Sequence, residues 1–269
     1  MKAYGKINLC LRVKNIENGY HNIDSVMAKI DLFDEVTLTS SKVNEAPLYD
    51  GKNSVLKALE LIQAKYPVGS FKIDIIKNIP LKAGLGGSST DAGAVLKYFV
   101  ENKTITLKEA YELANKIGKD VAFFLSSIAQ RVEGVQDKFT DIAISPLSFI
   151  MIKPKGGVST KECYELYDKN PIHLEGNVDE LIKGLKTNNI ELIKNNMFND
   201  LEQASKQLNP NIQEAIDELN SNGSLKSIVT GSGSAVIGLY PNHDMANQAI
   251  KNFETNKYEL VKIIETKTI

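Results

Sequence analysis

Hydrophobic and polar residues alternate near the N-terminus in a pattern that predicts a β-strand. Apolar residues occupy every second position from 7 to 13, which is the period of a strand with one buried face. Lys6 and Asn8 share a face of this strand. Their side chains can therefore act together.

A second strand is predicted to return after a tight turn. Asn18-Gly19 is a strong signal for such a turn, because both residue types tolerate a left-handed backbone. The turn brings Tyr20 and His21 to the start of a strand that continues to residue 30.

Longer segments carry the period of amphipathic helices. Residues 53–65 have one apolar face, and residues 106–117 open with a Thr-x-x-Glu capping box. Further helices are predicted at 91–102, 160–167, 178–186, 190–196, 201–207, 212–220 and 245–254, and further strands at 34–39, 71–75, 130–135, 149–153, 226–230, 235–240 and 258–264. This mixture predicts an α+β fold with helices packed on an antiparallel sheet. A boundary between residues 147 and 148 would give two domains, 1–147 and 148–269.

A glycine-rich stretch at residues 80–91 lies between a predicted strand and a predicted helix. Glycine lets backbone N–H groups approach an anion closely, and a helix start leaves N–H groups unpaired at its positive end. The stretch is therefore predicted to bind phosphate through Pro80, Lys82, Ala83, Gly84, Leu85, Gly86, Gly87, Ser88, Ser89 and Thr90.

Spacing and composition exclude several other classes. No Gly-Lys pair is followed by Ser or Thr, as a Walker A loop requires, and Ser89 replaces the third glycine of a dinucleotide fingerprint. The net charge of -1 comes from interspersed charges, which argues against a nucleic-acid partner. Apolar runs stay short of a membrane span, and Cys10 and Cys163 lack metal-ligand spacing. We therefore expect a cytoplasmic protein.

Four features follow one another in a fixed order: Lys6-Ile7-Asn8, the 80–91 stretch, Asp120 and Gly231-Ser232-Gly233-Ser234. Together they resemble the GHMP kinases, which phosphorylate small-molecule hydroxyl groups from ATP. Gly19-Tyr20-His21, Asp91-Ala92 and residues 119–124 are most similar to the members that act on 4-diphosphocytidyl-2-C-methyl-D-erythritol, in the methylerythritol phosphate route to isoprenoids.

The resemblance implies a mixed, β-rich N-terminal domain and a ferredoxin-like C-terminal α/β domain, with ATP and Mg²⁺ as cofactors. Phosphoryl transfer needs a group that accepts the hydroxyl proton and a cation that stabilises the phosphoryl charge, and Asp120 and Lys6 suit these roles. By resemblance, Asn8 would orient the acceptor, and a set of residues would hold the cytosine end of the substrate: Tyr20, His21, Thr160 and Tyr164. Gly231, Ser232 and Gly233 would support the phosphates, or would form only a tight connection between strands.

Two alternatives remain open. The chain could be another GHMP kinase, acting on mevalonate, phosphomevalonate or homoserine, or a nucleotide-binding regulator without catalysis. The expected partner is a small molecule with a cytidine diphosphate group. Neither a nucleic acid nor a membrane is expected as a partner, and the chain is predicted to be a monomer or a weak homodimer.

Overall fold

The computed structural model describes residues 1–17, 19–49 and 53–267, which form two compact units. The first unit contains Met1–Gly5, Leu32–Leu81 and Gly86–Ser127, and the second contains Lys6–Asp31, Lys82–Leu85 and Ile128–Ile269. Each unit therefore combines segments that are distant in the sequence. The predicted boundary between residues 147 and 148 stays a prediction.

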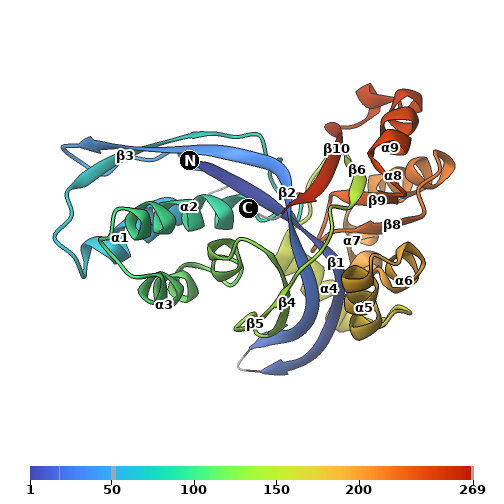
Figure 1. Ribbon diagram of the computed structural model, residues 1–269, viewed down its shortest axis with the longest axis horizontal. Helices are drawn as coiled ribbons and strands as arrows, with labels where there is room; N and C mark the ends of the chain where they lie inside the picture. The colour runs from blue at the N-terminus through green and yellow to red at the C-terminus, as the bar shows by residue number, and fades with distance from the viewer. Residues whose placement is uncertain (18, 50–52, 268–269) are drawn as a thin grey trace. The chain divides into compact units, whose positions relative to one another are not determined.

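In the first unit, two strands pair and three helices pack together (Figure 1). The C-terminal half of β2 (Tyr20–Ser41) runs antiparallel to β3 (Ser70–Ile76), from Glu35 opposite Ile76 to Ser41 opposite Ser70. The helices are α1 (Ser54–Gln63), α2 (Gly87–Glu101) and α3 (Leu107–Ile117), followed by the 3₁₀ segment η1 (Ala122–Leu125).

Two helices of this unit, α1 and α3, begin as their sequences predict. Asn53 caps α1 through a hydrogen bond from the Leu56 N–H, and Thr106 and Glu109 form the predicted capping box of α3. The apolar face of α1 is buried at Val55, Ala58, Leu59 and Ile62, as predicted. This burial fixes α1 against α2 and α3.

The second unit is built on a mainly antiparallel sheet with the strand order β5-β4-β2-β10-β6-β9-β8. β1 lies beside β2 and pairs in parallel with the short β7. The strands are β1 (Lys2–Glu17), β4 (Ala129–Gly134), β5 (Lys138–Ile142), β6 (Ser148–Lys153), β7 (Phe198–Asn199), β8 (Lys226–Val229), β9 (Val236–Tyr240) and β10 (Leu260–Lys267).

The helices of this unit pack against the sheet, around a buried apolar core, or against one another. They are α4 (Thr160–Lys169), α5 (Val178–Thr187), α6 (Ile190–Asn196), α7 (Glu202–Leu208), α8 (Asn211–Ser221) and α9 (His243–Ala249), with 3₁₀ segments η2 (Ile250–Asn252) and η3 (Thr255–Lys257). The core joins residues of β1, β6, β8 and β9 to residues of α4, α7, α8 and α9.

Several element boundaries differ from the sequence predictions: β1 is longer than the predicted strand, α9 ends at Ala249 instead of residue 254, and β5 was not predicted. Three further differences have a structural reason. β2 is one strand where two were expected, because buried Asp34 accepts hydrogen bonds from the Asn78 and Ile79 N–H groups and need not leave the strand. α2 begins at Gly87 instead of Asp91, since Gly86 takes a left-handed conformation and starts the helix there. β10 ends at Lys267, because its last residues pair with β2.

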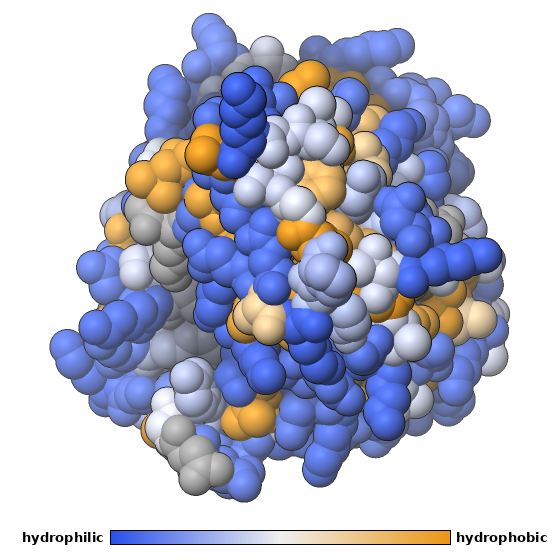
Figure 2. Space-filling view, turned by 90° about the vertical axis from the view of Figure 1, so that its left-hand side faces the viewer, coloured by the Kyte–Doolittle hydropathy of each residue, from blue (hydrophilic) through white to orange (hydrophobic). Residues whose placement is uncertain are grey.

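Figure 2 shows a face on which hydrophilic residues predominate and hydrophobic ones form small separate groups. Among the described residues, no helix has the length and apolar character needed to cross a membrane. Asn18 lies outside the described residues, so the turn predicted there stays a prediction.

Candidate active site

Lys6 and Asn8 form a buried pair on β1. Lys6 is 4% exposed, and its Nζ donates a hydrogen bond to Asn8 Oδ1 at 2.5 Å. Asn8 Nδ2 donates in turn to Ser25 Oγ at 2.7 Å, and the Asn8 N–H donates to Thr230 Oγ1 at 2.8 Å. The predicted common face is therefore present, and further hydrogen bonds hold Asn8 in position.

Two glycine-containing segments pack backbone against backbone beside this pair. A Cβ on Gly84, where φ is +75°, would lie 2.2 Å from the Thr230 carbonyl oxygen. A Cβ on Gly231, where φ is +58°, would lie 2.9 Å from the Gly84 carbonyl oxygen and 3.1 Å from Lys6 Nζ. Side chains at either position would separate the two segments, so glycine is required for their contact.

Backbone hydrogen bonds fix the same contact. The Ser234 and Ala235 N–H groups donate to the carbonyl oxygens of Lys82 and Ala83, at 3.1 and 3.2 Å, and the Lys6 N–H donates to Leu85 at 3.0 Å. Ala83 and Leu85 are buried, whereas Lys82 is exposed. The predicted phosphate stretch is thus anchored by these backbone hydrogen bonds and by the burial of Ala83 and Leu85.

The rest of the predicted phosphate stretch forms the first turn of α2. Gly86 occupies the N-cap position with φ of +73°, and no side chain of the described part of the chain caps the helix there. The uncapped N–H groups and the helix dipole suit an anion. Ser88 Oγ lies 2.9 Å from Ser54 Oγ, while the buried Thr90 donates its hydroxyl hydrogen to the Tyr4 carbonyl oxygen at 2.9 Å. Thr90 therefore holds the helix in place.

Asp120 lies in the turn between α3 and η1. Its Oδ1 is buried and has no hydrogen-bond partner within the described ranges. The turn is packed against α2, where a Cβ on Gly93 would lie 3.0 Å from Phe124 Cβ. A buried carboxylate oxygen without a partner is costly, which is typical of a group kept for chemistry. Lys6 belongs to the other unit, so its approach to Asp120 stays a prediction.

The residues predicted to hold the cytosine end of a substrate lie around the start of β2 and the start of α4. His21 Nε2 is 2.7 Å from Asp168 Oδ1, and the His21 and Tyr164 ring centroids are 4.6 Å apart. Tyr20 is 55% exposed. Thr160, the first residue of α4, lies 2.9 Å from Ser232 through the two hydroxyl oxygens. The structure thus brings His21 and Tyr164 together.

Comparisons with known proteins agree with the predicted family. The model of the GHMP kinases N terminal domain matches residues 53–138, and the GHMP kinases C terminal model matches residues 181–260. The chain belongs to the GHMP kinase family.

Full-length relatives show which members of the family the chain is similar to. The chain is 35% identical to the 4-diphosphocytidyl-2-C-methyl-D-erythritol kinase of Clostridium botulinum (strain Eklund 17B / Type B), over 100% of this chain and 99% of the relative. It is 34% identical to the enzyme of the same name from Caldicellulosiruptor bescii, over 100% of this chain and 97% of the relative. A crystal structure of 4-(cytidine 5'-diphospho)-2C-methyl-D-erythritol kinase matches with a TM-score of 0.84 and 25% identity, covering 99% of this chain and 98% of that one.

These matches confirm the predicted two-domain α+β fold and the predicted enzyme class, an ATP-dependent small-molecule kinase. The individual site residues stay predictions.

Sequence reasoning missed a charged cluster of this GHMP kinase at the start of α2. Lys77 Nζ contacts buried Asp34 and lies 2.9 Å from Asp91 Oδ2. A Cβ on Gly87 would lie 3.3 Å from the same Nζ. Lys77 thus ties the first turn of α2 to β2. Lys77 directly after a strand and Asp91 in the loop were the only sequence signals.

The charges of this cluster shift the pKa values of its members. Burial raises the pKa of Asp91 to about 7, since the nearby Lys77 offsets only part of the desolvation and Asp34 adds a second negative charge. Burial lowers the pKa of Lys77, but attraction by the two aspartates outweighs it, and the pKa is raised. One lysine therefore offsets only part of the cost of burying the Asp91 carboxylate.

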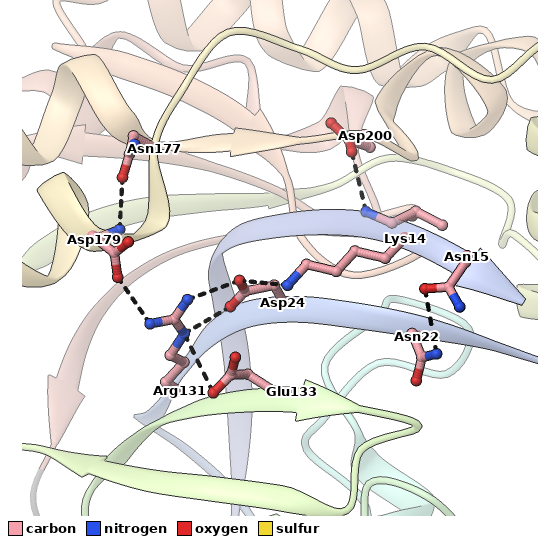
Figure 3. Close-up of polar contacts among 10 residues, drawn as sticks. Lys14, Asn15, Asn22, Asp24, Arg131, Glu133, Asn177, Asp179 and Asp200 are labelled. Atoms are coloured by element: carbon pink, nitrogen blue, oxygen red, sulfur yellow. Dashed lines mark hydrogen bonds and ion pairs between the residues drawn. The ribbon is translucent and has the colours of Figure 1, made fainter. Parts of the chain in front are cut away.

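A second missed cluster supports the hairpin that carries Tyr20 and His21. In Figure 3, Asp24 of β2 lies between Lys14 and Arg131, with Asp179 beyond Arg131. Arg131 donates two hydrogen bonds of 2.8 Å to Asp24, and Lys14 Nζ lies 2.9 Å from Asp24 Oδ2. Burial raises the pKa of Asp24, but these hydrogen bonds outweigh it and the pKa is lowered. The cluster holds β2 to β1 and β4 close to His21.

Proposed function

We propose that this GHMP kinase transfers the γ-phosphoryl group of ATP to the 2-hydroxyl of 4-diphosphocytidyl-2-C-methyl-D-erythritol. The observation that carries the substrate assignment is the ring contact between His21 and Tyr164, centroids 4.6 Å apart, next in sequence to the exposed Tyr20. Aromatic rings at this point suit a flat base, which gains about 1–3 kcal/mol from each stacking ring. The full-length relatives carry the corresponding name.

In the proposed mechanism, the protein positions the reactants and stabilises charge. ATP phosphates would bind at the start of α2, whose first N–H groups have no side-chain cap in the described part of the chain. Asp120 would accept the proton of the attacking hydroxyl, and Lys6 would stabilise the charge that develops on the transferred phosphoryl oxygens. Asn8, held by Lys6 and Ser25, would orient the hydroxyl. Gly231, Ser232 and Gly233 would support the phosphates by keeping Gly84 in place.

Mg²⁺ is proposed as the ion that accompanies ATP. Within the described ranges, no group of three or more His, Cys, Asp or Glu side chains could hold a metal ion. Mg²⁺ usually takes most of its oxygen ligands from phosphates and water and only one or two from carboxylates. A site with few protein ligands therefore fits this ion. Ser89, Thr90 or Asp91 at the start of α2 would make the protein contact, which leaves Asp120 for the hydroxyl. The ion would neutralise charge on the phosphates.

We further propose a cytoplasmic enzyme that is a monomer or a weak homodimer and does not bind nucleic acid or membranes. The interspersed charges and the net charge of -1 support this proposal.

The assignment is tested by offering the purified protein Mg-ATP with three acceptors: the cytidine diphosphate ester, mevalonate and homoserine. We expect ADP release with the cytidine ester alone, and phosphorylated ester as its product. Turnover of mevalonate or homoserine with the ester ignored would replace the proposal by another GHMP activity. Tight ATP binding without turnover of any acceptor would indicate a non-catalytic regulator.

A further inference from the structure

Helix α4 holds the imidazole of His21 at two points. Asp168 Oδ1 lies 2.7 Å from Nε2, and the ring of Tyr164 packs on the imidazole at a centroid distance of 4.6 Å and an interplanar angle of 30°. The His21 side chain is 15% exposed. The imidazole is therefore in a defined orientation although it lies near the surface.

The spacing of α4 explains why both contacts occur together. Tyr164 and Asp168 are four residues apart and share one face of the helix. Cys163 and Tyr167 precede them by one position each and are buried in the apolar core, which fixes the rotation of α4. The helix thus presents a ring and a carboxylate to His21 as a unit.

The Asp168 contact also decides which nitrogen of neutral His21 carries the hydrogen. An ionised carboxylate can only accept hydrogen bonds, so the hydrogen must lie on Nε2. Nδ1 is then left with a lone pair and can only accept. An acceptor at this position complements the 4-amino group of cytosine and opposes the 4-oxo group of uracil.

We propose that Asp168 is a positioning residue that sets the tautomer of His21 and thereby its preference for cytosine over uracil in the substrate. This inference rests on the proposed function, because it assumes that His21 faces the base through Nδ1. Asp168 itself does not touch the substrate; it acts through His21 and shares with Tyr164 the task of holding the ring.

A purely structural ion pair is the competing explanation. Asp168 is 41% exposed, and exposed ion pairs contribute only about 0–1 kcal/mol to stability. Removing such a pair would leave substrate selection unchanged, although it would still release the tautomer of His21. Both properties can be measured separately from stability.

The tautomer is tested by ¹⁵N NMR of the full chain in mildly alkaline buffer. We expect the wild-type His21 spectrum to show hydrogen on Nε2 and a bare Nδ1, and Asp168→Ala to give a mixture of tautomers. Asp168→Glu, which restores a carboxylate, should recover the wild-type signature. Identical spectra for wild type and Asp168→Ala would overturn the inference, whether or not the enzyme turns over the proposed substrate.

Selection is tested by kinetics with the cytidine diphosphate ester and its uridine analogue. Asp168→Ala should raise KM for the cytidine ester about tenfold, as expected for loss of a hydrogen bond to a charged group, and reduce the cytidine-to-uridine preference. KM for ATP and the melting temperature should stay the same. The control is Glu165→Gln on the same helix, whose exposed carboxylate pairs with Lys161 at 3.7 Å. It should behave as wild type.

The outcomes separate the two proposals. If wild-type enzyme ignores the cytidine ester, the proposed function fails, and the NMR spectrum still decides the tautomer. If wild type phosphorylates the ester but Asp168→Ala keeps its KM and its preference for cytidine, the function stands and the inference fails.

Discussion

Asp120 combines burial with an unpaired oxygen. Its Oδ1 has no hydrogen-bond partner in the described part of the chain, although the turn around it is packed against α2. The packing holds the carboxylate in place and leaves Oδ1 without a hydrogen bond from the described part of the chain. A general base needs both properties, because it must reach its proton and accept it.

Replacing Asp120 by Asn should remove the base while preserving the shape of the turn. We expect kcat to fall by about 10²–10⁴-fold, the usual contribution of general base catalysis, with a much smaller change in KM for ATP. Steady-state kinetics with Mg-ATP and the cytidine ester measure both constants. Asp74→Asn, at an exposed position of β3, is the control and should leave kcat unchanged. Unchanged turnover in Asp120→Asn would exclude Asp120 as the base.

Gly231 permits the close approach of a backbone segment to the Lys6–Asn8 pair. Replacement by Ala should place a methyl group 3.1 Å from Lys6 Nζ and 2.9 Å from the Gly84 carbonyl oxygen, in addition to strain at a φ of +58°. We expect a loss of about 2–3 kcal/mol in the free energy of unfolding, together with a lower kcat.

Gly223→Ala separates the two effects of replacing Gly231 by Ala, which are backbone strain and close contact with neighbouring atoms. Gly223 has a φ of +82° but no atom within 4 Å of the added Cβ, so only backbone strain applies, about 1 kcal/mol. Urea unfolding of both variants gives the comparison. Equal losses in the two variants would show that the contact with Gly84 and Lys6 is unimportant.

At the scale of elements, the start of α2 depends on the Lys77 cluster. Lys77 connects Asp91 in the helix to Asp34 in β2, and Asp34 Oδ1 accepts the Asn78 and Ile79 N–H groups at 2.6 and 2.8 Å. The end of the helix that we propose to bind phosphate is thereby fixed to β2. A positive charge close to Gly87 also favours an anion there.

The raised pKa of Asp91 predicts the direction in which the free energy of unfolding changes with pH. Because burial raises this pKa from 3.8 to about 7, the folded chain keeps a proton that the unfolded chain has released in that interval. The contribution of Asp91 to the free energy of unfolding should therefore fall as the pH rises from about 4 to about 7. Asp91→Asn cannot titrate and should lack this decline, which amounts to about 3 kcal/mol at roughly 1.4 kcal/mol for each pKa unit.

Urea unfolding of wild type and Asp91→Asn at both ends of this pH interval measures the effect. The variant should gain stability relative to wild type on going to the higher pH. The exposed Asp74→Asn should show no such gain. A constant difference between wild type and Asp91→Asn across the interval would contradict the raised pKa.

At the scale of the whole molecule, local patterns predicted more of the fold than of the site. The capping box of α3, the apolar face of α1 and the order of motifs depend on neighbouring residues, so the sequence alone revealed them. The continuity of β2 depends on N–H groups that reach Asp34 from residues 78 and 79, and the contact of Gly84 with Gly231 joins distant segments. Such partners follow from tertiary structure and have no local signal.

Hydrogen exchange on the intact chain should distinguish the proposed ATP site from the proposed site of the cytidine group. A non-hydrolysable ATP analogue with Mg²⁺ should slow amide exchange at residues 86–90, because phosphates would bind the open N–H groups of α2. Cytidine diphosphate alone should slow exchange at residues 20–22 and 160–168, where the His21–Tyr164 contact holds the strand start to α4. Mass spectrometry of peptic peptides measures both patterns. Protection of residues 160–168 by the ATP analogue alone would reverse the proposed assignment of the two ligands.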